Sequence, residues 1–361
     1  MAEVARFEEI ALEAQEVLDC SFSKWAPLFR ENVFPYRIIS PLAEAFLKYL
    51  LSDGIELPSS KEAKVVLERN SDNEYSDWEE EEEEETKIEE VGGEKASGDA
   101  CISALYEQVS RDIKDLGGSV IPKLNWSSPK DARWLMPGNI IRCTGVDDVL
   151  LLLKSSDHIT DDLVDPFSEV QSGSSSSGSS SSVPSVEYEL VLKQWQDINP
   201  ALEFRVFVRD GKILGVTQRD LNHYDFLKDL HSQLKAKIDA FVTVEAIPRL
   251  DASLPELKKY TLDVYIPEPF EKVYIIDVNP FSRKSDSYLF TWNELLTKNV
   301  TKDYEMRLIN ETNMGAFAKT QFSESKVPID VVGASHDTET LIELAREWRK
   351  LQTNGSLGED D

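Results

Sequence analysis

The chain has 361 residues, of which 41% are hydrophobic and 9% aromatic, so it can bury a sizeable core and is not globally disordered. Its net charge is −28, and residues 72–94 contribute −12 of this through 13 Asp/Glu and one Lys, which leaves −16 for the rest. A chain this acidic is not expected to bind nucleic acid directly, because such binding depends on Lys and Arg, and a basic protein surface is the better-matched partner.

The cysteines and the apolar runs exclude further classes of protein. Cys20, Cys101 and Cys143 stand far apart and form no CxxC pair, which argues against a disulfide framework and against a zinc site. The sequence begins without a basic and apolar signal segment, and no apolar run approaches the ~20 residues that span a bilayer. We therefore expect a soluble, monomeric, cytoplasmic protein with no membrane contact.

Two segments of low complexity divide the chain. Residues 72–95 contain seven consecutive glutamates, and residues 171–183 are almost entirely Ser and Gly. Both are predicted to be disordered loops inserted into a folded unit, because neither can bury apolar surface. The remaining pieces are assigned to a first subdomain (1–70 and 96–168), a second subdomain (183–300) and a C-terminal extension with a helix (301–361).

The first subdomain is predicted to be mainly helical. Apolar residues recur at helical spacing from Val4 to Leu18, and a second helix is expected to begin at Pro41 and to end at Gly54. A short helix then ends at Gly117, and a strand leads into Lys123.

The second subdomain is predicted to be rich in strands. Apolar and polar residues alternate from Val186 to Leu192 and from Phe204 to Val208, and Asp210-Gly211 predicts a tight hairpin turn before a return strand that ends at Gln218. Together with the first subdomain, these strands indicate an α+β fold. The remaining predicted elements are a helical stretch from Asp220 to Phe241, two strands at Tyr260–Ile266 and Val273–Val278, and a final helix at Leu341–Leu351.

Polar side chains interrupt the last predicted strand. In VYIIDVNPF the period of two places Val273, Ile275, Asp277 and Asn279 on one face and their neighbours on the other. Two oxygen-bearing side chains therefore lie on one face where a buried strand normally carries Val or Ile.

Asp263 interrupts the preceding strand, YTLDVYI, in the same way. A short loop between the strands would place it directly opposite Asp277, with the two Cβ atoms about 5 Å apart. Carboxylates so close repel each other unless a cation lies between them, and Mg²⁺ is commonly held by one or two carboxylates together with phosphate oxygens. Asp263, Asp277 and Asn279 are therefore predicted to hold a Mg²⁺ ion that carries a nucleotide. The alternative is an Asx-type turn at Asp277 and an ion pair between Asp263 and a lysine such as Lys258.

Basic residues adjoin several predicted strand ends, where they could bind phosphate. In an ideal two-residue hairpin Glu203, Arg205 and Gln218 share a face, and Arg219 points the other way unless the strand ends or bulges there. Taken singly, each basic residue is more often a solvated surface charge, but as a set in an acidic protein they indicate a phosphate site. The set is Lys123, Lys193, Arg205 and Arg219.

Other motifs narrow the chemistry. The polar turn Asn125–Asp131 either caps a helix or contacts phosphate. The sequence contains no Walker A loop, no GxGxxG after a strand, no HExxH and no GxSxG, and its histidines have no metal-ligand spacing. Hydrolase and zinc chemistry are therefore not expected.

The sequence contains, in this order, the five blocks FPYRIISPLAEAFLKYLLSDGIELP, PKLNWSSPKDARWL, EFRVFVRDGKILGVTQRD, IIDVNPF and SYLFTW. Together these blocks resemble the cell division cycle protein 123 family. The resemblance runs from about Trp25 to Trp292, and it implies an ATP-grasp-like fold in which two α+β subdomains close on ATP and Mg²⁺. It also implies an assembly chaperone for eukaryotic translation initiation factor 2, which binds the gamma subunit and promotes joining of the alpha subunit.

The resemblance also implies roles for single residues. Lys123 and Lys193 would be the lysines for phosphate and for the adenine side, and Glu203 would reach the ribose. The remaining assignments are Val191 and Leu192 as the hinge that meets adenine through backbone groups, Arg205 and Arg219 for phosphate, Asp263, Asp277 and Asn279 for Mg²⁺, and Asn125, Trp126 and Ser128 as lining from the other subdomain.

Many ATP-grasp proteins are ligases, but the sequence identifies no acceptor site. We therefore expect a nucleotide-binding assembly factor rather than an enzyme. The alternative is an ATP-grasp ligase or kinase-like enzyme, which would show steady ATP turnover that requires an acceptor.

Overall fold

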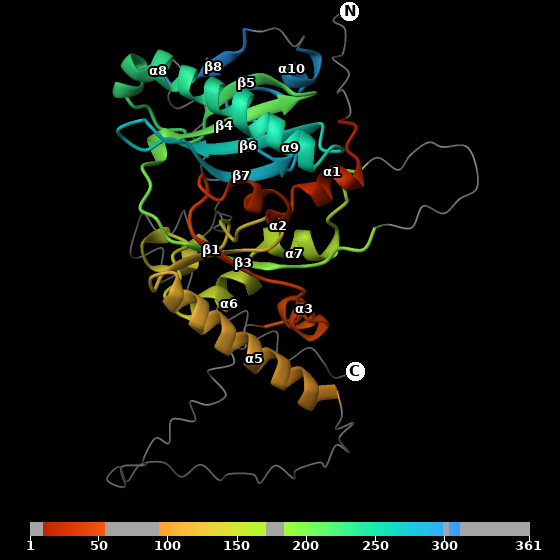
Figure 1. The fold of residues 1–361 in the computed structure, drawn as a ribbon. Coiled ribbons are helices and arrows are strands. Elements are labelled where there is room, and N and C mark those ends of the chain that lie inside the picture. Colours follow the sequence, from red (N-terminus) through yellow and green to blue (C-terminus); the bar gives the residue numbers. More distant parts are fainter. Residues whose placement is uncertain (1–9, 55–93, 171–183, 299–302, 311–361) are drawn as a thin grey trace, which may run out of the picture.

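The computed structural model describes residues 10–54, 94–170, 184–298 and 303–310, which form an α+β fold of two lobes, each built around one β-sheet (Figure 1). Among these residues no helix combines the length and apolarity needed to cross a membrane. The expected C-terminal helix, the Ser-rich stretch and most of the acidic stretch lie outside the described residues.

The smaller lobe contains an antiparallel three-stranded sheet with β3 in the centre. Alternate residues of β3 face opposite sides, so that Leu190 and Leu192 pack against the helices of this lobe while Val191 faces the other lobe. The elements of this lobe are β1 (Tyr36–Ile39), β2 (Val120–Lys123), β3 (Leu190–Gln194), α3 (Glu44–Leu51), α5 (Glu94–Asp115), α6 (Val146–Lys154), α7 (Asp157–Val164) and the short turns η2 (Arg133–Leu135) and η3 (Pro137–Asn139).

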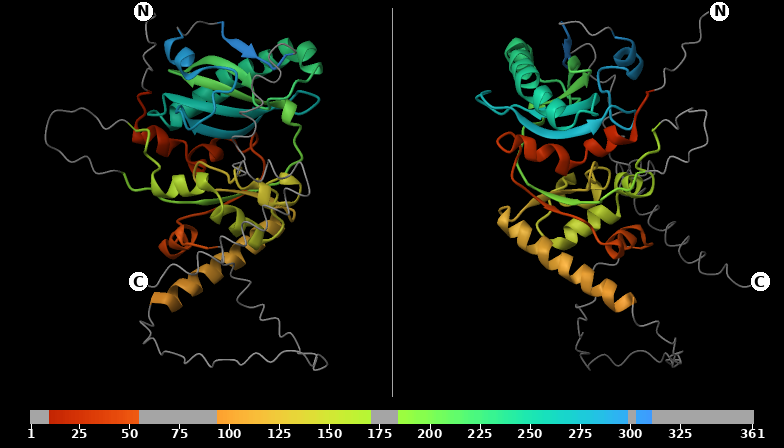
Figure 2. Two further views of the ribbon diagram at one scale, coloured as in Figure 1. Left: turned by 180° about the vertical axis from the view of Figure 1, so that it is seen from behind. Right: turned by 45° about the vertical axis from the view of Figure 1, so that its right-hand side comes forward.

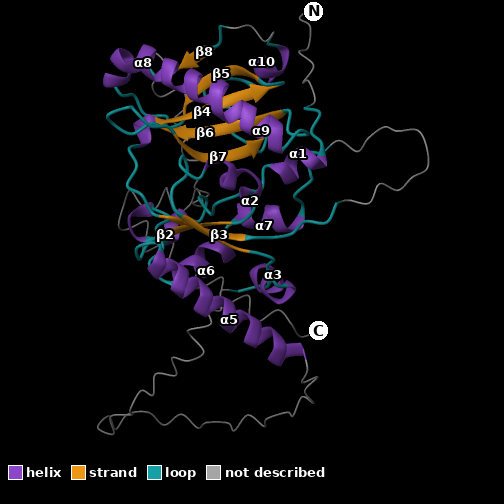
Figure 3. Cartoon of the chain, viewed as in Figure 1, coloured by secondary structure: helices purple, strands orange, loops and turns teal. Residues whose placement is uncertain are grey.

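The larger lobe contains a five-stranded sheet in the order β7-β6-β4-β5-β8, antiparallel except for the β5–β8 pair. Helices α8 and α9, joined by one π-helical turn, cover one face of this sheet (Figure 3). The elements are η4 (Pro200–Leu202), β4 (Glu203–Arg209), β5 (Lys212–Gln218), α8 (Phe226–Phe241), η5 (Val242–Ala246), α9 (Ile247–Ser253), β6 (Lys259–Tyr265), β7 (Tyr274–Pro280), α10 (Trp292–Thr297) and β8 (Glu305–Arg307).

The N-terminal segment lies between the two sheets (Figures 1 and 2). It consists of α1 (Ala14–Asp19), α2 (Phe22–Trp25) and η1 (Ala26–Phe29), whose aromatic side chains belong to the core of the larger lobe. The Trp126 indole donates to the Val17 carbonyl at 2.7 Å, and the Ile275 N–H donates to the Asn32 carbonyl at 2.7 Å. The segment therefore bonds to both lobes.

The predicted hairpin is confirmed, and it contains a bulge. Asp210 and Gly211 have φ values of 50° and 68°, the left-handed region that a tight hairpin turn requires. A register shift between Phe207 and Val208 adds one residue to β5, so that Phe204 rather than Glu203 pairs with Gln218.

Several expected boundaries were wrong. Helix α3 begins at Glu44 rather than Pro41, β3 begins at Leu190 rather than Val186, α8 begins at Phe226 rather than Asp220, and β1 was not predicted. The sequence division also placed β3 with the second subdomain, whereas it completes the sheet of the smaller lobe. A low-complexity insertion marks a surface loop and not a boundary between subdomains. A long loop can be inserted within one lobe because the entropic cost of closing a loop rises only slowly with its length.

Candidate functional site

Charged residues form one row across the larger sheet. Asp277 on β7 is in register with Asp263 on β6, and Asp263 is in register with Arg205 on β4. Side chains at directly opposed positions share a face, with Cβ atoms about 5 Å apart. The predicted opposition of the two carboxylates is therefore confirmed.

Asp263 is 2% exposed and is paired with arginine. Arg205 Nε and Nη2 donate to its two oxygens at 2.7 and 2.8 Å, and Arg219 Nε lies 3.4 Å from Oδ2. Burial alone would raise the pKa of Asp263, but the two guanidinium groups outweigh it and hold the pKa well below its usual range. The partner of this carboxylate is thus Arg205 and not the Lys258 of the alternative interpretation.

Asp277 connects the two lobes. Lys123, 1% exposed, reaches from β2, and its Nζ lies 2.5 Å from Asp277 Oδ1. The same oxygen accepts the N–H of the next residue, Val278, at 3.1 Å. An Asx-type turn would bond the N–H two residues on, so this contact within β7 is not the turn of the alternative interpretation. Asp277 remains partly accessible, with 19% of its side chain exposed.

Lys193 is held beside Lys123 by a bulge in β7. The register shift between Asp263 and Val264 makes Ile276 the extra residue, and its carbonyl accepts Lys193 Nζ at 2.7 Å. The pKa of Lys193 is lowered to about 8, mainly by burial; the charge of Asp277 opposes this shift and the charge of Lys123 adds to it. This ammonium group therefore loses its proton more readily than that of an ordinary lysine.

The same bulge corrects one prediction for β7. Ile275 pairs with Val264 and Val278 pairs with Leu262, and all four are buried in the core of the larger lobe. Ile275 therefore does not share the face of Asp277, because one extra residue reverses the alternation.

The bulge in the β4–β5 hairpin brings Arg219 to the charged row. The Arg219 N–H donates to the Glu203 carbonyl at 3.0 Å, and its Nη1 lies 2.8 Å from the Glu203 carboxylate. Arg219 therefore lies beside Glu203 and on the face of Arg205, and Gln218, which the ideal hairpin placed there, pairs with Phe204. The bulged alternative for this strand is the one observed.

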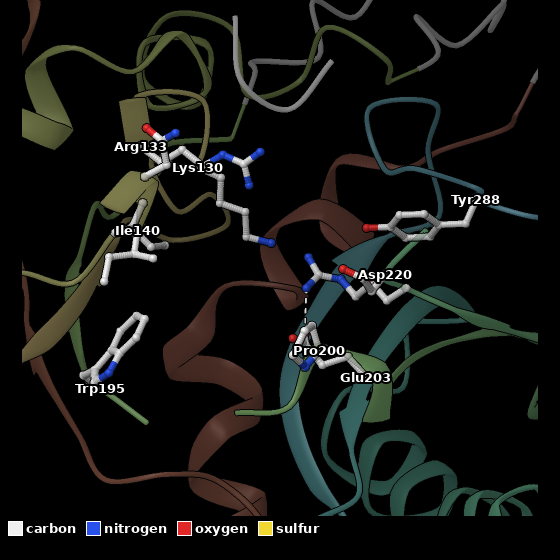
Figure 4. A pocket seen from close by; sticks show the side chains of 11 residues that line it. Lys130, Arg133, Ile140, Trp195, Pro200, Glu203, Asp220 and Tyr288 are labelled. Atoms are coloured by element: carbon white, nitrogen blue, oxygen red, sulfur yellow. Dashed lines mark hydrogen bonds and ion pairs between the residues drawn. The ribbon is translucent and has the colours of Figure 1, made fainter. Parts of the chain in front are cut away.

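Two adjoining cavities lie between the lobes above this row. The first, of about 280 Å³, has the apolar walls Ile140, Trp195 and Pro200, and Figure 4 shows Lys130 extending toward it from the smaller lobe. The second, of about 210 Å³, is strongly polar. They share Lys130, Arg219 and Tyr288, so they form one cleft with an apolar end and a charged end.

The structure brings most of the predicted site residues to this cleft. Lys123 and Lys193 extend from the smaller lobe and contact β7 beside the charged row. Lys123 contacts the Asp277 carboxylate, and Lys193 contacts the Ile276 carbonyl. Glu203 lines the first cavity, and the residues that line the second are Trp126, Ser128, Arg205, Arg219, Asp263, Asp277 and Asn279.

Five predicted residues are not among those lining these two cavities, namely Lys123, Lys193, Asn125, Val191 and Leu192. Asn125 is 2% exposed, and its side chain bonds the Glu187 carbonyl at 2.9 Å and the Glu189 N–H at 3.1 Å. It therefore ties the loop after β2 to the segment before β3. Val191 and Leu192 lie in the central strand of the smaller sheet, paired on both sides.

Sequence reasoning missed residues whose position depends on folding. Tyr288 lies over Arg205, with the ring centroid 5.0 Å from its guanidinium carbon, and the Asp286 carbonyl accepts Arg205 Nη1 at 2.7 Å. Lys130 stands within the recognised block PKLNWSSPKDARWL, which is the one signal that could have found it. Trp195, which directly follows β3, has no comparable signal in the sequence.

The predicted metal ligands provide oxygen atoms only. In the part of the chain that the structure describes, no group of three or more His, Cys, Asp or Glu side chains is placed to hold a metal ion. Two carboxylates and an amide nevertheless fit a hard cation such as Mg²⁺ when phosphate and water complete its coordination. Asp277 is paired with Lys123 through Oδ1, and Asp263 is paired with Arg205 through both oxygens, so a metal ion would compete with these two cations.

Two lobes, each with its own β-sheet, that face each other across a charged cleft define a two-lobed α+β protein. The chain belongs to the D123 family, whose model matches residues 25–335. This confirms the family resemblance found in the sequence.

Relatives of known name support this assignment along nearly the whole chain. A translation initiation factor eIF2 assembly protein of Lodderomyces elongisporus is 59% identical and covers 100% of this chain and 97% of its own. Cell division cycle protein 123 of Candida glabrata is 45% identical, with 97% of this chain and 96% of its own covered. The solved structure of C-terminally truncated Cdc123 from Schizosaccharomyces pombe matches with a TM-score of 0.64 at 31% identity, covering 84% of this chain and 100% of that chain.

Proposed function

We propose that the cleft binds ATP with Mg²⁺ and that the protein assists assembly of eukaryotic translation initiation factor 2. The observation that carries the nucleotide site is the row Arg205–Asp263–Asp277, completed by Lys123 from the opposite lobe. Arg205, Asp263 and Asp277 line the second cavity, and buried Lys123 pairs with Asp277. This arrangement is suited to a polyanion with its metal ion.

The two ends of the cleft fit the two ends of the nucleotide. The apolar walls of the first cavity suit a base, and Glu203 lies where it could accept a ribose hydroxyl. In the second cavity Lys and Arg outnumber Asp, although the chain as a whole is acidic, and this local excess favours phosphate. The charged residues there are Lys130, Arg205, Arg219, Lys284, Asp263, Asp277 and Asp286.

Ligand binding would exchange the ion pairs of this structure. Asp263, Asp277 and Asn279 would hold Mg²⁺, which neutralises phosphate charge when it is bound. Lys123 and Arg205, released from their carboxylates, would then turn their donors to phosphate oxygens. Nucleotide and metal ion should therefore bind together far better than either alone, because each would satisfy the charges that the other leaves unpaired.

The role in assembly is carried over from the named relatives. One of them, the Lodderomyces elongisporus protein at 59% identity, is an eIF2 assembly protein. We propose that this chain binds the gamma subunit and promotes joining of the alpha subunit, with bound ATP shaping the docking surface rather than being turned over. An acidic protein is matched to a basic surface on such a partner.

Two measurements test the proposal. Calorimetry should show tight binding of ATP with Mg²⁺, weak binding of ATP in excess chelator, and no binding by the Asp277→Asn variant. Affinity capture of the tagged chain, analysed by mass spectrometry, should recover the gamma subunit, and recovery should fall without ATP and Mg²⁺. Equal ATP affinity in the wild-type protein and in Asp277→Asn would remove Asp277 from the site.

A further inference from the structure

Ser127 and Asp162 form a close pair beside the second cavity. Ser127 lies in the loop after β2, and Asp162 lies in the last turn of α7. The Ser127 hydroxyl donates to Asp162 Oδ1 at 3.0 Å, and the Ser127 N–H donates to Oδ2 at 2.9 Å. Two bonds from one residue hold the carboxylate, so the serine hydroxyl has a fixed direction.

The serine stands between this carboxylate and the proposed phosphate site. Ser127 lines the second cavity and also a third cavity of about 110 Å³, whereas Asp162 lines only the third. The two cavities also share Trp126, Asn279, Lys284 and Ser285, so they adjoin at the predicted metal ligand Asn279. A phosphate group held by the charged row would therefore have the Ser127 hydroxyl on its wall.

The surroundings of Asp162 favour proton uptake. Burial raises the pKa of Asp162 to about 6, although the two bonds from Ser127 and, after them, the charges of Lys123 and Lys284 act to lower it. A carboxylate with such a pKa is still ionised at pH 7 but accepts a proton more readily than an ordinary aspartate. A hydroxyl bonded to such a carboxylate is the arrangement of an activated nucleophile.

We infer that Ser127 accepts the γ-phosphoryl group of the bound nucleotide, with Asp162 as the general base; this inference rests on the proposed ATP binding. Ser127 Oγ forms a bond to the γ-phosphorus while the bond from that phosphorus to the β,γ-bridging oxygen breaks. The hydroxyl proton passes to Asp162 Oδ1, and ADP leaves. Lys130 and Lys284, which line the same cavity, stabilise the charge on the transferring group.

The reaction modifies the chain itself and occurs once per molecule. It needs no separate acceptor, and it is therefore compatible with a protein that shows no steady turnover. The competing explanation is that Asp162 only fixes the loop through the Ser127 N–H. Asp162→Asn distinguishes the two, because an asparagine oxygen can still accept that N–H but the side chain cannot take a proton from the hydroxyl.

The test is phosphorylation of the purified full chain with ATP labelled at the γ-phosphate and Mg²⁺, with the site located by mass spectrometry. We expect up to one phosphate per chain, on Ser127, and loss of this signal in Ser127→Ala. Asp162→Asn should react about 100-fold more slowly or worse, the range for loss of a general base. Ser127→Thr should restore transfer, and Asp161→Asn, a matched change at an exposed neighbour on α7, should react as the wild type does.

Calorimetry with a non-hydrolysable ATP analogue separates this inference from the proposed function. A wild-type chain that binds the analogue but acquires no phosphate on Ser127 overturns the inference and leaves nucleotide binding intact. Equal rates of phosphorylation in wild type and Asp162→Asn likewise overturn the role of Asp162 as general base. Asp162 would then only fix the loop through the Ser127 N–H. A wild-type chain that does not bind the analogue overturns the proposed function and this inference together.

Discussion

Lys123 on β2 and Asp277 on β7 form an ion pair of 2.5 Å that joins the two lobes at the floor of the cleft. The lysine is almost fully buried, whereas the carboxylate is partly accessible from the cavity. A ligand that reaches the accessible carboxylate would therefore decide whether the buried ammonium group keeps its partner.

This pair changes what we expect from Asp277→Ala. From the sequence alone the substitution should spare the fold, because it relieves repulsion with Asp263. In the structure Arg205 already neutralises Asp263, so the substitution leaves Lys123 buried without its counterion. We expect a loss of about 3–5 kcal/mol in the free energy of unfolding, measured in urea, and recovery of much of it in the Asp277→Ala, Lys123→Met double variant. Losses that simply add in the double variant would show that the two side chains are not coupled.

Lys193→Met should separate stability from nucleotide binding. Burial disfavours the charged form of Lys193, so an uncharged side chain of similar length should cost little stability or raise it. The affinity for ATP with Mg²⁺ should nevertheless fall, because the lysine that the family resemblance implies for the adenine side is lost. Thermal unfolding and calorimetry on the same samples test this, with Lys228→Met, at an exposed position of α8, as a control that should change neither. A large drop in melting temperature would assign Lys193 a purely structural role.

Arg205 and Asp263 should make the fold sensitive to acid. The pKa of Asp263 is lowered in the folded chain, while an unfolded aspartate has a pKa of about 3.9. The unfolded state therefore binds more protons as pH falls, so this stabilisation is fully present above about pH 5 and is lost toward the folded-state pKa. Both charges are removed in the double variant Arg205→Met, Asp263→Leu. Its free energy of unfolding, measured in urea, should depend less on pH between about pH 5 and 2 than that of the wild type. Unchanged slopes would show that other carboxylates control acid stability.

Association with the proposed gamma-subunit partner should depend on salt. The chain retains a net charge of −16 without residues 72–94, so complementary charges would speed the encounter. We expect the association rate to fall markedly between low and physiological ionic strength, over which the Debye length shortens to about 8 Å. Truncation after Pro328 should weaken binding without unfolding the nucleotide-binding body. Stopped-flow rates that do not change with salt, together with full affinity after truncation, would contradict this expectation.

The charged row could be predicted because it follows from local rules. The period of two in a strand and the short connection between β6 and β7 suffice to place Asp263 opposite Asp277. Arg219 and Ile275 could not be placed in this way, because their faces depend on bulges that no residue pattern marked. One extra residue is enough to turn a side chain from the core to the cavity.

Contacts between distant segments account for the other differences. Asn125 stands in a recognised block, yet its partners Glu187 and Glu189 come from beyond the Ser-rich stretch. The pairing of Ser127 with Asp162 and the insertion of α2 between the lobes are equally non-local. Such contacts leave no periodic trace in one sequence, and the three-dimensional fold was needed to find them.

The order of strands in the smaller sheet has a consequence for synthesis of the chain. Within the described residues β1 and β2 pair with β3 and not with each other, and β3 begins only at Leu190 of 361 residues. At about 5–20 residues per second, a ribosome needs on the order of ten seconds or more to pass from β1 to β3. During that time the edges of the first two strands have no native partner, and unpaired edges can join those of other nascent chains. The N-terminal half of this chain is therefore expected to need protection by ribosome-associated chaperones before its own lobe can form.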